Sequence, residues 1–304
     1  MTLEQLRGSY RDYPVKLMDG EGGGGGGLPC LEVRGKLADA RIYLYGAHIT
    51  HFQPRGQKPV LFLSRESHFH PGKPIRGGVP VCWPWFGAKA GNPNAPSHGF
   101  ARLQTWEVTS IATLPGEQIE IILQLLPGDL ARALGYKHFE LEMRVVVGTT
   151  LTMTLTSRNT GTSPLLINEA LHSYFQVGDI TRTTLTGLQG ATYMDKTQAM
   201  QRFTQKEAAL TFAGETDRHF INTAAETVIH DPAMGRRIVI GKGVSDTTVV
   251  WNPWVDKAEA MADFGDEEWK TMLCVETANA ADNAITLQPG QSHAMQAIIR
   301  VEAL

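Results

Sequence analysis

The sequence predicts an all-β protein, built as a large antiparallel β-sandwich with few short helices. The first observation is that apolar and polar residues alternate in many short runs, the period of a strand with one buried face. The second is that Gly, Pro, Asn and Asp interrupt these runs at close intervals. The third is that helical patterns are scarce: only residues 128–134 and 257–269 are compatible with short helices.

The strand pattern is clearest in the middle of the chain. In Thr150–Thr156, Leu151, Met153 and Leu155 alternate with threonines, so one face is apolar and the other polar. Further strands are expected, in chain order, at residues 41–49, 59–63, 119–125, 139–147, 237–240, 247–251, 271–275 and 293–301.

The length of 304 residues suits one large sandwich, so we expect a single domain over residues 1–304. Residues 1–30 are expected to form a peripheral N-terminal segment that includes six consecutive glycines at 22–27. A phosphate-binding P-loop is excluded because no Lys-Ser or Lys-Thr pair follows the glycines. We interpret the run as a mobile surface loop between early strands.

Composition excludes several classes of protein. Hydrophobic residues make up 42%, which is too many for a disordered chain. The net charge of −3 argues against non-specific binding to nucleic acid or to anionic membranes. An anionic small substrate stays possible, because a few local cations can hold it.

Three features predict a cytoplasmic protein. The cysteines at 30, 82 and 274 are odd in number and form no CxxC pair, which excludes a disulfide scaffold and a zinc ribbon. The N-terminus lacks the apolar region of a secretory signal. The most apolar window, residues 79–88, contains two prolines and is shorter than the ~20 residues of a membrane span. We expect a monomer with no membrane or nucleic-acid partner.

Residues 74–87, PIRGGVPVCWPWFG, are the most unusual stretch. Their glycines and prolines exclude a helix and disfavour a regular strand. Flat aromatic rings can stack on sugars, but for Trp83 and Phe86 a core position is the better interpretation. Arg76 is a stronger candidate for binding, since its glycine neighbours permit close approach of a ligand to the backbone.

Three other stretches carry chemistry. The sequence HGFAR places His98 four residues before Arg102, which combines a group that titrates near neutrality with a planar cation. His172 lies in an apolar strand-like run, where a satisfied core histidine is the commoner case. Glu276 ends the apolar run of MLCVETAN, where burial would raise its pKa and suit a general base. A solvent-facing strand end explains Glu276 equally well.

No metal or cofactor signature is present. His68 and His70 form an HxH pair, but no third ligand stands nearby and Pro71 interrupts the segment. The chain contains no GxSxG, HExxH or GxGxxG motif. Cys82 has no adjacent activating cation and is interpreted as a packing residue. We therefore expect neither a metal nor a cofactor.

Six motifs taken together resemble the aldose 1-epimerase superfamily, and more closely its bacterial D-hexose-6-phosphate mutarotase branch. The similarity runs from about Leu31 to the C-terminus, with the motifs in the order IRGGVPVCWPWFG, HGFAR, ALHSYF, ETDRHF, VVWNPW and CVETAN. The resemblance implies a β-supersandwich with its site in an open cleft, and an isomerase that interconverts the anomers of a hexose 6-phosphate.

The resemblance also implies residue roles. His172 matches the family's general acid and Glu276 its general base. In that chemistry the base takes the C1 hydroxyl proton while the acid protonates the ring oxygen, and closure reverses both transfers. The implied substrate-binding residues are Arg76, His98, Arg102, Asp217 and Trp251. At Ser97 the chain departs from relatives, so no substrate contact is assigned there.

Three alternatives stay open. A mutarotase for unphosphorylated aldoses would use the same acid and base, although Arg76 and Arg102 favour a dianion. A non-catalytic carbohydrate-binding module would not need both His172 and Glu276. A structural sandwich without a ligand leaves the HGFAR and ETDR motifs without a role.

Overall fold

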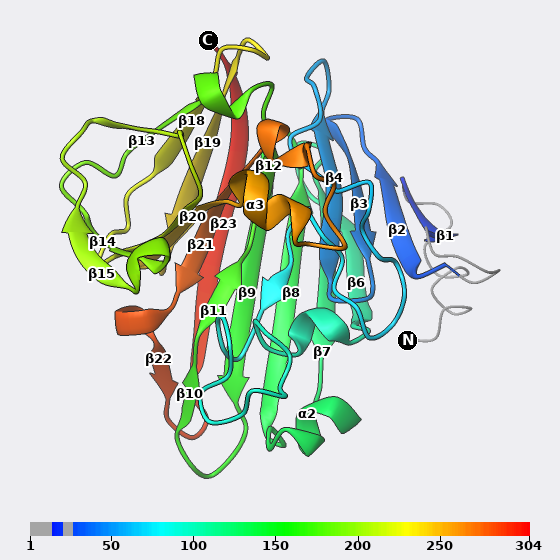
Figure 1. Cartoon of the computed structure of the whole chain (residues 1–304). Coiled ribbons are helices and arrows are strands. Elements are labelled where there is room, and N and C mark those ends of the chain that lie inside the picture. The colour runs from blue at the N-terminus through cyan, green and yellow to red at the C-terminus, as the bar shows by residue number, and fades with distance from the viewer. Residues whose placement is uncertain (1–13, 21–26) are drawn as a thin grey trace.

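The computed structural model describes residues 14–20 and 27–304 and has the expected all-β architecture (Figure 1). In the described residues its strands form four sheets of nine, eight, four and two strands, and these strands pair with one another in antiparallel orientation. Two short α-helices occur in the described part, α2 (Asp129–Ala133) and α3 (Trp254–Glu259). No helix in the described ranges is long and apolar enough to cross a membrane.

The nine-stranded sheet forms one layer of the sandwich. In spatial order it consists of β16 (Ala209–Thr211), β13 (Thr184–Thr186), β18 (Thr227–Asp231), β19 (Arg236–Gly243), β23 (Ser292–Ala303), β9 (Leu151–Asn159), β8 (Phe139–Val147), β7 (Ile119–Leu125) and β6 (Glu107–Thr113).

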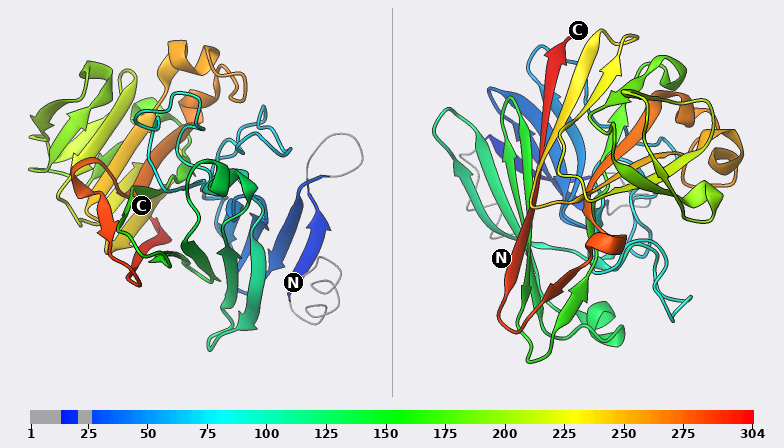
Figure 2. Two further views of the ribbon diagram at one scale, coloured as in Figure 1. Left: turned by 90° about the horizontal axis from the view of Figure 1, so that it is seen from below. Right: turned by 90° about the vertical axis from the view of Figure 1, so that its left-hand side faces the viewer.

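The eight-stranded sheet forms the second layer, and the right-hand view of Figure 2 shows the two layers beside each other. Its order is β15 (Gln201–Thr204), β14 (Thr192–Asp195), β17 (Thr216–Ile221), β20 (Thr247–Asn252), β21 (Met272–Asn279), β11 (Glu169–Leu171) and β5 (Val81–Cys82), with β12 (Tyr174–Gln176) also paired to β21.

Smaller elements complete the fold. The four-stranded sheet contains β1 (Val15–Asp19), β2 (Pro29–Arg34), β3 (Ala38–Tyr43) and β4 (His48–Pro54), and β10 (Leu165–Ile167) pairs with β22 (Ile285–Leu287). The 3₁₀ turns are η1 (Ala101–Leu103), η2 (Ile180–Arg182), η3 (Lys196–Gln198), η4 (Glu268–Thr271) and η5 (Ala281–Asn283).

The N-terminal segment lies partly within this description. Its strand β1 pairs with β2 at the edge of the four-stranded sheet. Residues 22–26 of the glycine run lie outside the described residues, so the interpretation of that run as a mobile loop stays a prediction.

Three predicted elements differ from the structure. Residues 41–49 form the end of β3 and the start of β4, because the chain turns at Gly46 and Ala47, which both have positive φ. Residues 59–63 make single bridges instead of a strand, because Leu61 pairs with Phe175 and Leu63 with Gly77. The stretch 257–269 holds only the end of α3 and the start of η4, which residues 260–267 separate.

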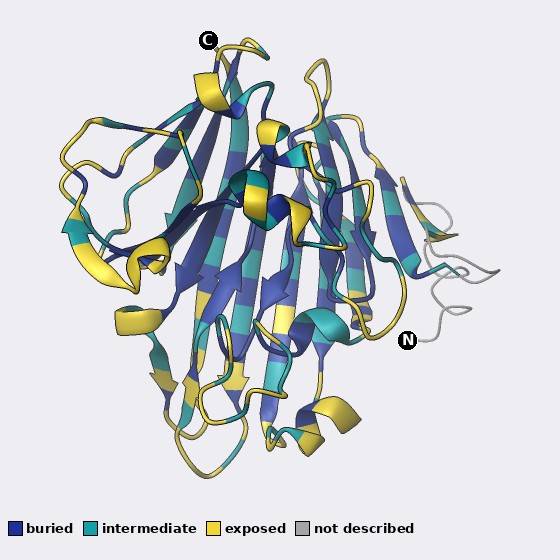
Figure 3. Cartoon of the chain, viewed as in Figure 1, coloured by how far each residue is buried: buried dark blue, intermediate teal, exposed yellow. Residues whose placement is uncertain are grey.

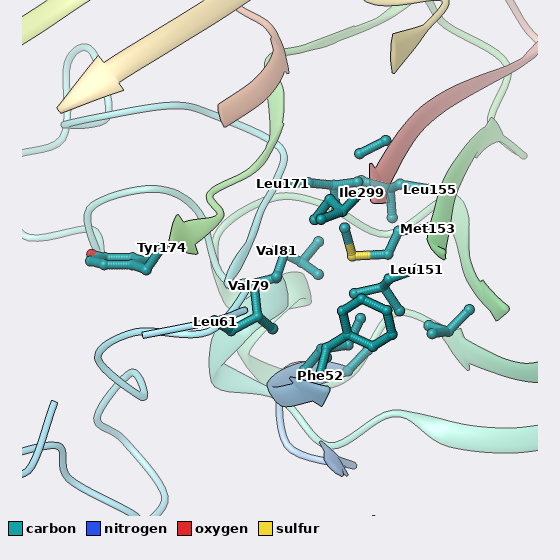
Figure 4. Close-up of a cluster of buried hydrophobic side chains, with 14 of the residues drawn as sticks. Phe52, Leu61, Val79, Val81, Leu151, Met153, Leu155, Leu171, Tyr174 and Ile299 are labelled. Carbon is teal, nitrogen blue, oxygen red and sulfur yellow. The ribbon is translucent and has the colours of Figure 1, made fainter. Parts of the chain in front are cut away.

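The apolar core fills the space between the two large sheets. Buried residues cover the middle of the strands and exposed residues the turns at their ends (Figure 3). The alternating residues Leu151, Met153 and Leu155 of β9 lie in one cluster with side chains from other strands, and Tyr174 lies at the edge of this group (Figure 4). The period-two pattern therefore identified the core face of β9 correctly.

One polar cluster joins the two layers. Glu169 of β11 is fully buried and lies 2.9 Å from His293 Nε2 of β23. The Asn279 amide of β21 donates to Glu169 at 3.1 Å, and the Ser157 hydroxyl of β9 at 3.2 Å. The hydrogen bond to Glu169 raises the pKa of His293 against the opposing effect of burial. The cluster thus connects β11 and β21 to β9 and β23 of the nine-stranded sheet.

We predict that this cluster stabilises the protein more at low pH than at high pH. A raised folded-state pKa means that the charged interaction is fully present below the unfolded value of about 6.5 and is lost as pH rises through the folded value. Replacing His293→Gln keeps a donor and removes the charge. Its cost in unfolding free energy, measured by urea denaturation, should be about 1 kcal/mol larger at pH 5.5 than at pH 8.5. A cost independent of pH would contradict this.

Candidate active site

The strand register of the eight-stranded sheet places polar side chains on the face away from the core. Opposite residues in adjacent antiparallel strands project to the same face. Asp217 of β17 pairs with Trp251 of β20, Trp251 with Cys274 of β21, and Cys274 with Tyr174 of β12. These four residues form one cross-strand row.

A second row lies beside the first and contains the buried carboxylate. His219 of β17 pairs with Val249 of β20, and Val249 pairs with Glu276 of β21. Between β11 and β12 the register places His172 opposite Glu276, since Leu171 pairs with Thr277 and Tyr174 with Cys274.

His172 and Glu276 form a buried pair. The distance from His172 Nε2 to Glu276 Oε1 is 3.3 Å, and the two residues are 7% and 1% exposed. His172 Nδ1 and Glu276 Oε2 have no hydrogen-bond partner among the described residues. Both free atoms are therefore available to a ligand, because buried polar groups are normally hydrogen-bonded.

Burial decides the protonation of this pair. It lowers the pKa of His172 to about 3, helped by the positive charges of Arg102 and Arg76. It also raises the pKa of Glu276 well above the usual value, helped by the negative charge of Asp217. Both shifts favour a neutral imidazole beside a protonated carboxyl group.

The pair lies in a cavity of about 170 Å³ that is partly open to solvent. Figure 1 shows α3 in front of the sheet strands that carry these residues, and Lys257 and Met261 of this segment line the cavity. The full set of lining residues is Arg76, Phe86, His98, His172, Tyr174, Lys196, Asp217, His219, Val249, Trp251, Lys257, Met261 and Glu276.

His98 enters the cavity from a loop whose backbone fixes its ring. The His98 amide donates to the Gly87 carbonyl at 2.7 Å, and the Gly87 amide donates to His98 Nδ1 at 3.3 Å. Burial lowers the pKa of His98 well below the usual value, so the ring is neutral. Because Nδ1 accepts, the proton lies on Nε2, and His98 can donate it to a ligand oxygen.

The aromatic residues of this loop divide into two groups. Trp83 is fully buried, as expected for a core residue. Phe86 is only partly buried and lines the cavity, so a core position was wrong for it. Its ring centroid lies 4.7 Å from that of His98 and 5.5 Å from that of His219. Phe86 therefore offers an apolar face inside the cavity.

Arg76 is held by two partners. Its Nη1 donates to the Tyr174 hydroxyl at 2.9 Å, and its Nη2 lies 3.2 and 3.1 Å from the two carboxylate oxygens of Asp263. Arg76 Nε has no hydrogen-bond partner among the described residues. The guanidinium group is thus fixed at the cavity wall with donor capacity to spare.

Asp217 lies between two cationic or potentially cationic groups. Its carboxylate oxygens are 3.2 Å from Lys196 Nζ and 3.4 Å from His219 Nε2. Burial acts to raise the pKa of Asp217, but the hydrogen bond from His219 and the charge of Lys196 lower it overall. Asp217 is therefore an anionic acceptor, suited to hydroxyl groups.

Arg102 is the one predicted substrate-binding residue that does not line the cavity. Its Nη2 donates to the Ser97 carbonyl at 2.8 Å, so the side chain supports the loop that carries His98. The structure brings the other predicted residues, Arg76, His98, Asp217 and Trp251, together with the pair of His172 and Glu276.

Sequence reasoning missed several lining residues. His219 lies within the quoted motif ETDRHF, where alternation with Asp217 along one strand could have indicated it. Lys196, Lys257 and Met261 carry no local signal, because they reach the cavity through η3 and the α3 segment.

Comparisons with known proteins agree with this fold. The chain matches the family model described as Aldose 1-epimerase over residues 29–300. A Cenchrus ciliaris protein provisionally named glucose-6-phosphate 1-epimerase is 37% identical over 274 residues, 87% of this chain and 82% of that protein. A protein of Escherichia coli K12 with the same provisional name is 34% identical over 259 residues, covering 85% and 86%.

The fold is also similar to those of solved mutarotase-like structures. A protein from Salmonella typhimurium, provisionally called a mutarotase, has a TM-score of 0.86 at 32% identity and covers 91% of this chain and 92% of its own. A galactose mutarotase-like protein from Clostridium acetobutylicum shares the fold, with a TM-score of 0.71 at 15% identity, covering 95% and 98%.

We predict that Gly99 is essential for the shape of the His98 loop. Its φ is +76°, and a Cβ there would lie 1.9 Å from the Trp83 carbonyl oxygen. Gly91 has a similar φ of +72° with nothing within 4 Å, so Gly91→Ala is a matched control that costs only about 1–2 kcal/mol of backbone strain. Gly99→Ala should lower the unfolding free energy clearly more. Equal costs in urea denaturation would show that the loop relaxes freely.

Proposed function

Because the chain belongs to the aldose 1-epimerase family, we propose that it interconverts the α and β anomers of a hexose 6-phosphate, with glucose 6-phosphate as the first candidate. The provisional names of the Cenchrus and E. coli relatives support this substrate. The observation that carries the proposal is the buried pair of His172 and Glu276 inside a cavity lined by three cationic side chains.

The proposed reaction moves two protons across one sugar. In the ion-pair form, the Glu276 carboxylate accepts the C1 hydroxyl proton while the His172 imidazolium protonates ring oxygen O5. The C1–O5 bond breaks, and the pair is left neutral, which is the state that burial favours. After rotation about C1–C2 the two proton transfers occur in reverse, and the ring closes to the other anomer. The neutral and ion-pair forms differ only in the position of one proton.

Neighbouring groups would hold the sugar between acid and base. The Nε2 proton of His98 can be donated to a sugar oxygen, and the carboxylate of Asp217 can accept hydroxyl protons. Trp251 and Phe86 line the same cavity and offer apolar ring surface to the sugar C–H bonds.

The phosphate group would be held by cations in the cavity wall. Arg76, Lys196 and Lys257 line it, and each is already paired with a carboxylate, from Asp263, Asp217 and Glu215 respectively. These carboxylates offset the positive charges of the wall, and the remaining N–H donors of the cations can bind a phosphate. Arg102 lies outside the lining, where its Nη2 donates to the Ser97 carbonyl, but its charge acts on His172 and its Nε has no hydrogen-bond partner among the described residues, so its role in substrate binding stays a proposal.

Two alternatives give different results in the same assay. A mutarotase for unphosphorylated aldoses would exchange galactose or glucose faster than glucose 6-phosphate, as measured by NMR exchange spectroscopy at anomeric equilibrium. A carbohydrate-binding module would bind the sugar without accelerating exchange. The cations in the lining favour the phosphorylated substrate.

We predict that Glu276→Gln slows anomer exchange of glucose 6-phosphate by about 10²-fold or more in kcat, with KM little changed. The substitution keeps the shape of the side chain and removes the proton acceptor. Glu226→Gln, on the exposed surface, is the matched control and should leave the rate unchanged. Near-wild-type exchange in Glu276→Gln would show that Glu276 is structural.

We predict that Lys257→Met raises KM for glucose 6-phosphate by about tenfold and leaves the slow exchange of free glucose unchanged. The variant keeps the apolar stem and removes one charge from the cavity wall. Lys270→Met removes the same charge from the nearby turn η4, which does not line the cavity, and should change neither value. Equal losses of activity on glucose 6-phosphate and on free glucose would mean that Lys257 positions α3 or the sugar ring and does not bind the phosphate.

A further inference from the structure

Cys274 does not line the cavity, but it lies beside the pair of His172 and Glu276 and is a potential metal ligand that the proposed reaction does not use. Its residue row contains Trp251 and Tyr174, and it is fully buried, two residues before Glu276 on β21. A His172 nitrogen, Cys274 Sγ and a Glu276 carboxylate oxygen lie within 4.8 Å of one another. Such a group of three meets in this place although the sequence alone indicated no metal.

These three side chains match the donors that a zinc ion prefers. Thiolate, imidazole and carboxylate all bind Zn²⁺, at about 2.3, 2.0 and 2.0–2.2 Å, so tetrahedral ligand atoms lie ~3.3–3.8 Å apart. Side-chain shifts of about 1 Å would close the present group onto one ion. A sulfur donor selects Zn²⁺ or Co²⁺ over Mg²⁺ or Ca²⁺, which prefer oxygen.

A second observation points to a ligand that binds two of these three side chains. His172 Nδ1 and Glu276 Oε2 are buried without a hydrogen-bond partner among the described residues. Of the cations that act on this pair, Arg76 is paired with Asp263 and Lys196 with Asp217. Arg102, in contrast, donates only to the Ser97 carbonyl among the described residues, and its charge opposes a bound cation. A divalent cation would meet two buried atoms without a partner, and the negative charges left on Cys274 and Glu276 after they lose their protons would offset the charge of Arg102.

We propose that His172, Cys274 and Glu276 form a site for Zn²⁺ or a similar thiophilic divalent ion, and that the bound ion blocks the sugar reaction. On binding, the Cys274 thiol and the Glu276 carboxyl each release their proton to solvent, and the neutral imidazole gives its lone pair. The bound ion then holds both the acid, His172, and the base, Glu276, so that neither can transfer a proton to or from the sugar. The inhibition, but not the binding, rests on the proposed function.

The binding is tested by titrating the full chain with Co²⁺ and recording its absorption spectrum. One equivalent should produce a thiolate-to-cobalt charge-transfer band with tetrahedral d–d bands, and Zn²⁺ should remove both. Cys274→Ser and Cys274→Ala should lack the thiolate band, whereas Cys82→Ser, the matched buried cysteine of β5, should keep it. Glu276→Gln should weaken Co²⁺ binding at least about tenfold. Replacing a residue that only orients a metal ligand already lowers metal affinity by about that factor.

The inhibition is tested by anomer exchange of glucose 6-phosphate with added Zn²⁺ and, as a control, Mg²⁺. Zn²⁺ should inhibit the wild type, and Cys274→Ser should stay active and need at least about ten times more Zn²⁺. Absence of the thiolate band, its persistence without Cys274, or stimulation by Zn²⁺ would overturn the proposal. A normal Co²⁺ site with undiminished exchange would instead contradict the catalytic roles of His172 and Glu276.

Discussion

Glu276 faces the cavity because β21 pairs with β20 and β12 in one particular register, and the rest of the site follows from that pairing. Side chains alternate between the two faces of a strand, so a slip by one residue would turn Glu276 into the core and Val275 into the cavity. The same register sets His172 opposite Glu276 and places Asp217 and Trp251 in the adjoining row. The cluster around Glu169 connects β11 and β21 to the nine-stranded sheet, close to the pair.

Burial gives this arrangement its chemistry. An isolated carboxylate or imidazolium inside a protein is costly, and both shifts in pKa at the pair express that cost. Two adjacent groups avoid it by sharing one proton, so the ion-pair form needed for ring opening lies beside a neutral form of the same composition. The carboxylates beside Arg76, Lys196 and Lys257 balance the cations of the wall in the same manner.

The sequence was informative where the signal is local. The alternation in β9 predicted its core face, and short motifs contained His172, Glu276, His98 and Asp217. It was uninformative where a position depends on distant segments. Lys196 and Lys257, for example, reach the cavity only through tertiary packing. Three-residue strands such as β10 and β13 are too short to show a period.

The central claim is that His172 and Glu276 act on one sugar as a unit. A double-mutant cycle on anomer exchange tests this most directly, using His172→Asn, Glu276→Gln and the double variant with glucose 6-phosphate followed by NMR. If the groups share one transition state, each single change should cost about 10²–10⁴-fold, and the double variant should lose little more than the worse single. If the double variant instead loses the full product of the two single effects, the two residues act independently and the account is wrong.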